Sequence, residues 1–165
     1  MMGVKILIKN IRFYKGEKIA NILIESTKNF NAINCPTVLN SSAIDEFLLI
    51  FLVAAKAKGV SNFNKLSELN QKESPRLKWG SRILNKMGVK TILTKDSIKI
   101  YGNPNLKIKK DIIIKDYLKD HRIFMASTIA ALTLGGRWKI YDRSSIKTSF
   151  PSFINKIKKL GAKIY

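Results

Sequence analysis

The sequence predicts a mixed α/β fold made of repeated β-α-β-α-β-β units, and an internal repeat is the first observation behind this prediction. Asp45 and Asp120 each open an apolar helical stretch, and a lysine follows 27 residues after each of them, at Lys72 and Lys147. The two copies are therefore offset by 75 residues. A fixed offset between matching charges and helix starts is typical of a duplicated supersecondary unit.

The second observation is that apolar stretches of helical length alternate with short runs rich in β-branched residues, as in α/β domains. The copies also end alike, with Met-Gly-Val-Lys at 87–90 and Leu-Gly-Ala-Lys at 160–163. We therefore place two units at about residues 1–95 and 96–165.

The first unit begins with a predicted β-hairpin. Residues 4–11 and 19–25 are rich in β-branched side chains and alternate approximately, and Lys15-Gly16-Glu17 lies between them as a turn. Residues 45–58 are then apolar on nearly all sides, as in a buried helix, and Gly59 stands at its expected end.

The first unit continues with a short strand near residues 60–63 and a second helix. Ser74 is the expected cap of this helix, and Pro75 fits its first position, where a missing N–H costs nothing. The helix is expected to run to about Met87 and to stop at Gly88.

The second unit repeats this order after a predicted hairpin over residues 91–94 and 97–101 and a turn at Asn103-Pro104-Asn105. The remaining elements are predicted from β-branched runs, an apolar helical stretch closed by Gly135-Gly136, and a proline at a helix start. They are a strand at 111–114, a helix at 121–134, a strand at 138–141, a helix at 151–160 and a last strand at 162–164.

The composition fits one soluble domain or two small subdomains with a real core, because 45% of the 165 residues are apolar. The longest apolar run, residues 47–55, is too short to span a membrane, and the N-terminus lacks a secretory pattern. A single cysteine, Cys35, and a single histidine, His121, leave no disulfide framework and no Cys/His metal site. We expect a cytoplasmic protein without cofactor or metal.

The net charge of +20 indicates attraction to polyanions, and nucleic acid is the first candidate partner. However, 25 of the 31 cations are lysines spread evenly along the chain, without a basic tail or interleaved aromatic residues. We favour compositional drift on a solvated surface over a dedicated nucleic-acid face as the explanation of this pattern. A positive field would also concentrate small phosphorylated or carboxylated substrates.

Three cations lie at or beside predicted helix N-termini, where free N–H groups already favour an anion: Arg76, Arg122 and Lys147. They are candidate phosphate or carboxylate ligands. The competing interpretation is that Arg76 and Arg122 form local structural ion pairs with Glu73 and Asp120, and that Lys147 is a solvated surface residue.

Two acids are candidates for proton transfer, Asp45 and Glu73, because both lie beside the repeated basic positions. A carboxylate enclosed with several cations stays ionised and can accept a proton from a hydroxyl group. A helix cap is the commoner use of Asp at the place of Asp45, and Glu73 could likewise be a capping or ion-pairing residue. His121 is an accessory candidate as a proton donor or a packed hydrogen-bonding residue. No glycine-rich phosphate loop, nucleophile elbow or metal-ligand spacing is present in the sequence.

Four segments resemble the C-terminal part of the 5-enolpyruvylshikimate-3-phosphate (EPSP) synthase family of enolpyruvyl transferases. They occur in family order, and the resemblance covers the whole chain. The segments are Ile44-Asp45-Glu46-Phe47, Glu68-Leu69-Asn70-Gln71-Lys72-Glu73-Ser74-Pro75-Arg76, Asp120-His121-Arg122-Ile123-Phe124-Met125-Ala126 and Lys147-Thr148-Ser149-Phe150-Pro151.

The resemblance implies a fold and a reaction. Family members are α/β prisms of two lobes, each with three β-α-β-α-β-β units, so that residues 1–165 would be an incomplete C-terminal lobe. The family is 3-phosphoshikimate 1-carboxyvinyltransferase, an enzyme of the shikimate pathway to chorismate and the aromatic amino acids. The 5-hydroxyl of shikimate 3-phosphate attacks C2 of phosphoenolpyruvate, and phosphate then leaves a tetrahedral intermediate.

The resemblance also implies roles for individual residues. Asp45 would accept the hydroxyl proton, and Glu73 would lie by the methylene carbon that is transiently protonated. Lys72, and with weaker support Glu68, would contact the shikimate side. The phosphate and carboxylate of phosphoenolpyruvate would be held by Arg76, Arg122 and Lys147.

The sequence departs from the family mainly in length. A family member is more than twice as long, and its N-terminal lobe, which supplies further substrate contacts, has no counterpart here. We therefore expect a truncated chain, a partial gene or one half of a split enzyme that is inactive alone and self-associates through uncovered apolar surface. Smaller departures are Pro75, where the family usually has Asp, and Asn70-Gln71, where it has Arg-Val.

Two alternatives remain open from the sequence. One is a basic α/β module that binds nucleic acid, which would bind duplex or RNA tightly and lose affinity steeply with salt. The enzyme fragment would bind nucleic acid only weakly and without specificity. The other is a non-catalytic remnant that serves as a structural partner.

Overall fold

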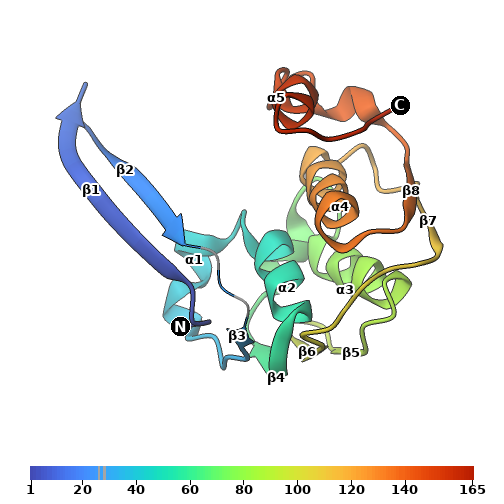
Figure 1. Cartoon of the computed structure of the whole chain (residues 1–165). Helices are drawn as coiled ribbons and strands as arrows, with labels where there is room; N and C mark the ends of the chain where they lie inside the picture. Colours follow the sequence, from blue (N-terminus) through green and yellow to red (C-terminus); the bar gives the residue numbers. More distant parts are fainter. Residues whose placement is uncertain (26, 28) are drawn as a thin grey trace.

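The computed structural model describes residues 1–25, 27 and 29–165, and shows a mixed α/β arrangement of helices and small sheets (Figure 1). The strands of these residues are β1 Lys5–Tyr14, β2 Glu17–Glu25, β3 Phe30–Asn31, β4 Ala57–Phe63, β5 Thr91–Leu93, β6 Ile98–Gly102, β7 Asp111–Ile114 and β8 Arg137–Ile140. The helices are α1 Asn40–Ala43, α2 Phe47–Ala55, α3 Arg76–Lys86, α4 His121–Leu134 and α5 Phe153–Lys159, with 3-10 turns η1 Thr37–Leu39, η2 Ser67–Gln71 and η3 Arg143–Ile146.

The strands form three separate sheets. The largest has the order β3-β4-β6-β5, in which β3 runs parallel to β4 while β6 is antiparallel to both β4 and β5. Strands β7 and β8 pair in parallel, and β1 pairs antiparallel with β2. The parallel pairs β3/β4 and β7/β8 flank the helices α2 and α4, as expected for β-α-β connections.

The order of elements is similar in two stretches of the chain. The first stretch reads β3, η1, α1, α2, β4, η2, α3, β5, and the second reads β7, α4, β8, η3, α5, so that η1 and α1 have no counterpart in the described residues of the second. Strand β6 follows the first stretch but completes its sheet, because it lies between β4 and β5. The division at about residue 95 remains a prediction.

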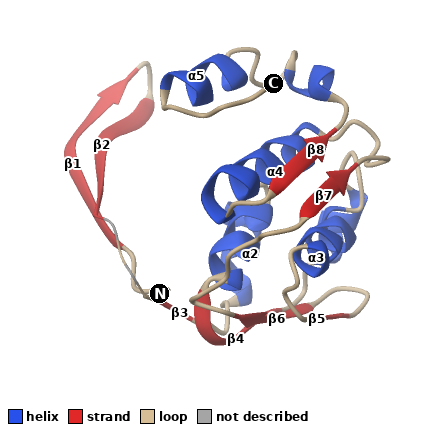
Figure 2. Ribbon diagram, turned by 45° about the vertical axis from the view of Figure 1, so that its right-hand side comes forward, coloured by secondary structure: helices blue, strands red, loops and turns tan. Residues whose placement is uncertain are grey.

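The helices α2, α3 and α4 pack together and supply half of the buried core residues (Figure 2). Three aromatic rings meet at its centre, with centroids of Phe51 and Phe63 5.2 Å apart and those of Phe47 and Phe51 5.7 Å apart. Helix α3 approaches α2 closely at Gly80, where a Cβ atom would lie 2.7 Å from the Phe51 ring. Strand β6 crosses the end of α2 at Gly102, where a Cβ would lie 2.5 Å from the Ala54 carbonyl oxygen.

The predicted N-terminal hairpin is confirmed by the antiparallel pair β1/β2, which stands away from this core (Figure 1). All ten residues of β1 and eight of the nine in β2 are exposed, including large apolar side chains on both faces. The turn uses Lys15 and Gly16 with φ values of 50° and 83°. A bulge between Lys9 and Arg12 coincides with a positive φ at Asn10.

Several other predictions are confirmed. Helix α4 spans the predicted residues 121–134, its Asp120 cap accepts a hydrogen bond from the Arg122 N–H, and Gly135 follows it with a φ of 84°. The hairpin of β5 and β6 and the strand β7 also form as predicted.

Three local predictions are wrong. The first buried helix ends at Ala55 rather than Lys58, and Gly59 lies inside β4 with a φ of 103°. Ser74 does not cap α3, because its hydroxyl donates to Asp120 instead. Residues 162–164 form no strand, since nothing in the described residues pairs with them in a sheet.

In the described part of the chain, no single helix has the length and apolar character needed to cross a bilayer. The helical segments Thr37–Ala43 and Phe47–Ala55 pass such a test only when taken together, and they are bent by 120° at the break between them.

Candidate functional site

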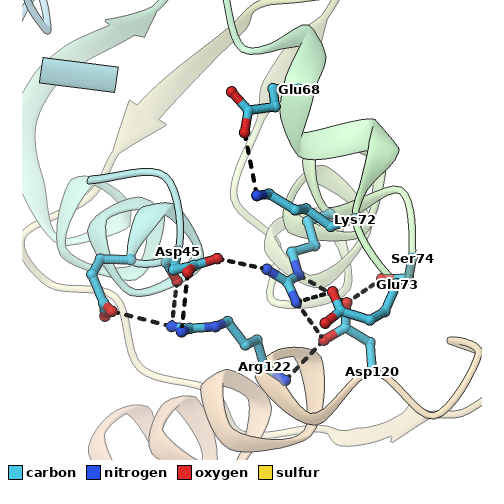
Figure 3. Close-up of polar contacts among 9 residues, drawn as sticks. Asp45, Glu68, Lys72, Glu73, Ser74, Asp120 and Arg122 are labelled. Carbon is cyan, nitrogen blue, oxygen red and sulfur yellow. Dashed lines mark hydrogen bonds and ion pairs between the residues drawn. The ribbon is translucent and has the colours of Figure 1, made fainter. Parts of the chain in front are cut away.

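A cluster of carboxylates and arginines lies where the starts of α2, α3 and α4 meet (Figure 3). We call it the carboxylate–arginine cluster, and its members are Asp45, Glu46, Glu73, Ser74, Arg76, Asp120 and Arg122. The residues come from three segments far apart in sequence: the turn before α2, the loop into α3 and the first turn of α4.

Arg76 is the centre of the cluster and is only 2% exposed. Its Nε donates to Asp120 Oδ2 at 2.9 Å, and its Nη1 donates to Asp45 Oδ1 at 3.0 Å. Its Nη2 donates to Glu73 and also to Asp120 Oδ1, the latter at 3.3 Å. The guanidinium has five N–H groups, and four hydrogen bonds join it to three carboxylates.

Asp120 is the buried partner of Arg76, with 1% of its surface exposed. Besides Arg76, it accepts from the Ser74 hydroxyl at 2.8 Å and from the Arg122 backbone N–H at 2.9 Å. One carboxylate thus caps α4 and ties its first turn to the start of α3. A buried charge is stable only when it is paired and hydrogen-bonded to this extent.

The pKa directions of this pair follow from its environment. Burial acts to raise the pKa of Asp120, but the hydrogen bonds from Arg76 and Ser74, the charge of Arg76 and the Arg122 N–H together lower it. Burial likewise acts to lower the pKa of Arg76, while Asp120 above all, with Glu73 and Asp45, leaves it raised. Both groups are therefore held in their charged forms.

Asp45 and Arg122 form the accessible side of the cluster. The Arg122 side chain is 28% exposed and the Asp45 side chain 45%, and their Nη2 and Oδ2 atoms are 3.3 Å apart. Arg122 Nη1 also donates to the Asp45 backbone carbonyl at 2.8 Å and to Glu46 Oε1 at 3.1 Å. Asp45 thus bridges the buried and the accessible arginine with its two carboxylate oxygens.

Glu68 and Lys72 lie above this cluster in Figure 3 and pair with each other, with Lys72 Nζ 3.3 Å from Glu68 Oε1. Glu68 lies in η2 and Lys72 is the residue after it, so that the pair joins positions four apart in the sequence. The Lys72 side chain is 26% exposed.

The two remaining candidates are not tied to the cluster by a side-chain contact in the described residues. His121 is the first residue of α4 and is half-buried. Lys147 is exposed and follows η3, where its backbone N–H donates to Ser144. The structure therefore joins Asp45, Glu73, Arg76 and Arg122, places Glu68 and Lys72 as a separate pair, and leaves the role of Lys147 a prediction.

Three members of the cluster were missed as site residues from the sequence: Glu46, Ser74 and Asp120. From the sequence, Asp120 was interpreted only as a helix start. It occupies the same position in the second repeat as Asp45 in the first, and this match could have identified it as a site residue. The hypothesis of local ion pairs is correct for Arg76 with Glu73. It is wrong for the Arg122 side chain, which pairs with Asp45 and Glu46 instead of Asp120.

The cluster carries four carboxylates against two guanidinium groups, although the whole chain has only 11 acids against 31 cations. Acids are thus concentrated at this place. Such an arrangement presents a hydrogen-bond acceptor, Asp45, next to a partly exposed guanidinium that can bind an anion. Within the described residues, no group of three His, Cys, Asp or Glu side chains is arranged to hold a metal ion.

Comparison with known families identifies residues 4–157 with the family described as EPSP synthase (3-phosphoshikimate 1-carboxyvinyltransferase). Similar proteins include the 3-phosphoshikimate 1-carboxyvinyltransferase of Ruthia magnifica subsp. Calyptogena magnifica, which is 36% identical over 99% of this chain and 37% of its own length. That of Hydrogenovibrio crunogenus is 34% identical over 99% of this chain and 36% of its own length.

Solved structures agree with the sequence relatives. An EPSP synthase from Acinetobacter baumannii superposes with a TM-score of 0.82 and 30% identity, over 96% of this chain and 36% of that one. The enolpyruvyl transferase NikO from Streptomyces tendae has a TM-score of 0.67 at 16% identity, which shows a common fold. The chain spans 36–37% of the length of these two curated relatives and of the Acinetobacter structure. From its match over residues 4–157, the chain belongs to the EPSP synthase family.

Proposed function

We propose that this chain is the C-terminal part of a 3-phosphoshikimate 1-carboxyvinyltransferase and supplies one side of its active site. The substrates would be shikimate 3-phosphate and phosphoenolpyruvate, and the other side of the site would come from an N-terminal lobe. The observation that carries this proposal is the meeting of Asp45, Glu73, Arg76 and Arg122 in one cluster. In the sequence these four residues lie in three separate family-like motifs, with Glu73 and Arg76 in the same one.

The proposed fold assignment is two β-α-β-α-β-β units, at about residues 1–95 and 96–165, of an incomplete α/β prism lobe. The similar order of elements in the two stretches of the chain supports it. So does the parallel pairing of β3 with β4 and of β7 with β8 around the helices α2 and α4.

The proposed role of Asp45 is to accept the proton of the attacking hydroxyl. Its half-exposed carboxylate is fixed by a hydrogen bond from Arg76 and an ion pair with Arg122, so that it would need little reorganisation to meet a substrate. Glu73 is held by Arg76 on the other side and would lie near the methylene carbon of phosphoenolpyruvate.

Arg122 is the cation of the cluster best placed to bind the carboxylate or phosphate of phosphoenolpyruvate, because its guanidinium is partly exposed. Arg76 is engaged by three carboxylates, and it would contact the same anion only by exchanging one of them. Lys147 would add a third cation, and Lys72 with Glu68 would contact shikimate 3-phosphate.

The chain alone is expected to be inactive or nearly so, because transition-state stabilisation requires groups that converge from both lobes. A chimera tests the proposal: this chain replaces its 164-residue counterpart in the Ruthia magnifica relative. Phosphate release from the two substrates is then measured for the chain alone and for the chimera.

Turnover by the chimera and none by the chain alone would support the proposal. In the chimera, Asp45→Asn and Glu73→Gln should each lower kcat by about 10²–10⁴-fold. Asp111→Asn is the matched control, since Asp111 is an exposed acid paired with Arg137 on β7 and β8. A folded chimera without turnover, or turnover that survives Asp45→Asn, would contradict the proposal.

A further inference from the structure

Glu46 is the most exposed acid of the carboxylate–arginine cluster, with 56% of its side chain accessible. Its Oε1 atom accepts a hydrogen bond from Arg122 Nη1 at 3.1 Å. Although Glu46 stands directly before α2, its side chain makes no capping hydrogen bond to that helix. Among the described residues, Arg122 is the only hydrogen-bond or ion-pair partner of this carboxylate. The position of the Glu46 side chain is therefore explained by Arg122 and not by the start of α2.

The other two acceptors of Arg122 are held in place. One is the backbone carbonyl of Asp45, 2.8 Å from Nη1. The other is Asp45 Oδ2, 3.3 Å from Nη2, and the same carboxylate accepts from the buried Arg76 through its Oδ1 atom (Figure 3). Neither acceptor can move without disturbing the backbone or the buried ion pair. Glu46 is thus the contact of Arg122 that can leave, because its side chain is flexible and more than half exposed.

The Glu46 contact occupies a part of Arg122 that an incoming anion would use. Nη1 carries two N–H groups, and its two acceptors are the Asp45 carbonyl and the Glu46 carboxylate. A phosphate or carboxylate binds a guanidinium most strongly through two of its N–H groups at once. Glu46 presents the same kind of charged group, and two anions at one N–H would repel each other. An anion that takes Nη1 must therefore displace Glu46.

We propose that Glu46 is an internal competitor for the anion site at Arg122. Its carboxylate occupies Nη1 while the site is empty, and it moves into solvent when the phosphate or carboxylate of a substrate binds. An exposed ion pair of this kind changes an equilibrium constant by about two- to fivefold. Glu46 thus holds the guanidinium in position without a ligand and sets the affinity for the ligand. The inference deepens the proposed function and rests on it, since Arg122 is the cation assigned there to phosphoenolpyruvate.

A supporting role for Glu46 makes the opposite prediction. If the Glu46 carboxylate stayed on Arg122 in the complex, it would hold the guanidinium toward the anion. Its removal would then weaken anion binding or leave it unchanged. The two roles therefore differ in the sign of one measured change, which the amide variant Glu46→Gln reports because it keeps the size of the side chain and removes its charge.

A phosphate titration of the full chain measures this sign. Inorganic phosphate is added to the parent chain and to Glu46→Gln at constant ionic strength, and the backbone amides of residues 46 and 122 are followed by NMR. We expect Glu46→Gln to bind phosphate about two- to fivefold more tightly. The matched control is Asp116→Asn, which also removes one negative charge, from a side chain that is 80% exposed beside Lys115. At about 0.15 M salt the control should change the affinity by less than about 1.5-fold.

The competition should disappear when its target is removed. In Arg122→Gln, the further change Glu46→Gln should give no gain in phosphate affinity. A gain of equal size with and without Arg122 would show that Glu46 acts only through its long-range field, and it would overturn the inference. Weaker or unchanged phosphate binding by Glu46→Gln in the parent background would overturn it as well.

The chimera described above separates this inference from the proposed function. There, Glu46→Gln should lower the KM for phosphoenolpyruvate about two- to fivefold and leave kcat within about twofold, since the competing contact is lost before the chemical step. Removal of a merely structural residue would not lower KM. An active chimera whose KM stays the same overturns the inference alone. A folded chimera without turnover contradicts the proposed function, and the phosphate titration then still decides the role of Glu46.

Discussion

Asp120 is the residue on which the carboxylate–arginine cluster depends most. Its carboxylate joins the first turns of α3 and α4 through Ser74, Arg76 and the Arg122 N–H. Without it, the Arg76 guanidinium would lose its one fully buried counter-charge, although Asp45 and Glu73 would still contact it.

Asp120→Asn should therefore destabilise the fold by about 3–5 kcal/mol, because removing one partner of a buried ion pair leaves the other charge uncompensated. Urea unfolding of the variant against the parent chain measures this. Asp111→Asn is the control and should change stability by no more than about 0.5 kcal/mol, since its pair with Arg137 is exposed. An equal loss of unfolding free energy in the two variants would show that the buried ion pair contributes no more to stability than the exposed one.

The lowered pKa of Asp120 also predicts how stability depends on pH. In the unfolded chain this carboxyl has a pKa of about 3.9. Because the folded value lies below that, the contribution is fully present above about pH 4 and is lost as pH falls through the folded pKa. Unfolding free energies measured from pH 6 down to pH 2 should show this loss. The loss should be smaller in Asp120→Asn, and parallel curves for the two proteins would contradict the assignment.

Long-range partners were the part of the site that could not be predicted from the sequence. The Asp120 cap was found because an N-cap is a local signal, visible from the residues that follow it. Its bond to Arg76 spans 44 residues, and nothing local distinguishes a cap that also serves as a counter-charge. For the same reason Ser74, which looks like a helix cap, bonds to Asp120 instead.

At the scale of elements, the bounds of a helix were predicted correctly where its ends carry clear signals. They were predicted wrongly where a strand begins directly after the helix. Helix α4 has an acid cap and a glycine stop, and its bounds were predicted correctly. Helix α2 ends at Ala55, and β4 begins two residues later, so that the apolar run continues from helix into strand. Apolar character alone cannot divide such a run. The strand expected at 162–164 lacks a neighbour with which to pair among the residues that the structure describes.

The β1/β2 hairpin should be dispensable for the stability of the rest of the chain. Its strands contribute no residue to the buried core, and Lys5 and Glu25 are register partners, so that a Gly-Gly link can replace Lys5–Glu25. We expect the unfolding free energy of this variant to stay within about 1 kcal/mol of the parent, since isolated hairpins are marginally stable. A urea midpoint much below that of the parent would show that the hairpin supports the core.

At the scale of the whole molecule, exposed apolar surface and high positive charge act in opposite directions on association. The hairpin exposes Ile6, Ile8, Phe13, Ile22 and Ile24, each more than half accessible. Such surface favours the self-association that the sequence predicts for this chain. The net charge of +20 opposes the approach of two copies.

Self-association should therefore strengthen with salt. Raising ionic strength from 0.01 M to 0.1 M shortens the Debye length from about 30 Å to about 10 Å, which screens the repulsion but leaves the apolar contact. Sedimentation velocity at several protein concentrations should show larger species at 0.1 M salt, and fewer of them in the variant without the hairpin. A monomer at all salt and protein concentrations would refute this.

The place of β6 has a consequence for the two repeated stretches. This strand belongs to the part of the chain after residue 95, yet it lies between β4 and β5 of the preceding part. A protease nick at the loop between β5 and β6 should therefore leave a single particle on a sizing column. A piece of the chain cut at residue 95 would therefore lack either the strand β6 from the middle of the largest sheet or the strands on both sides of it.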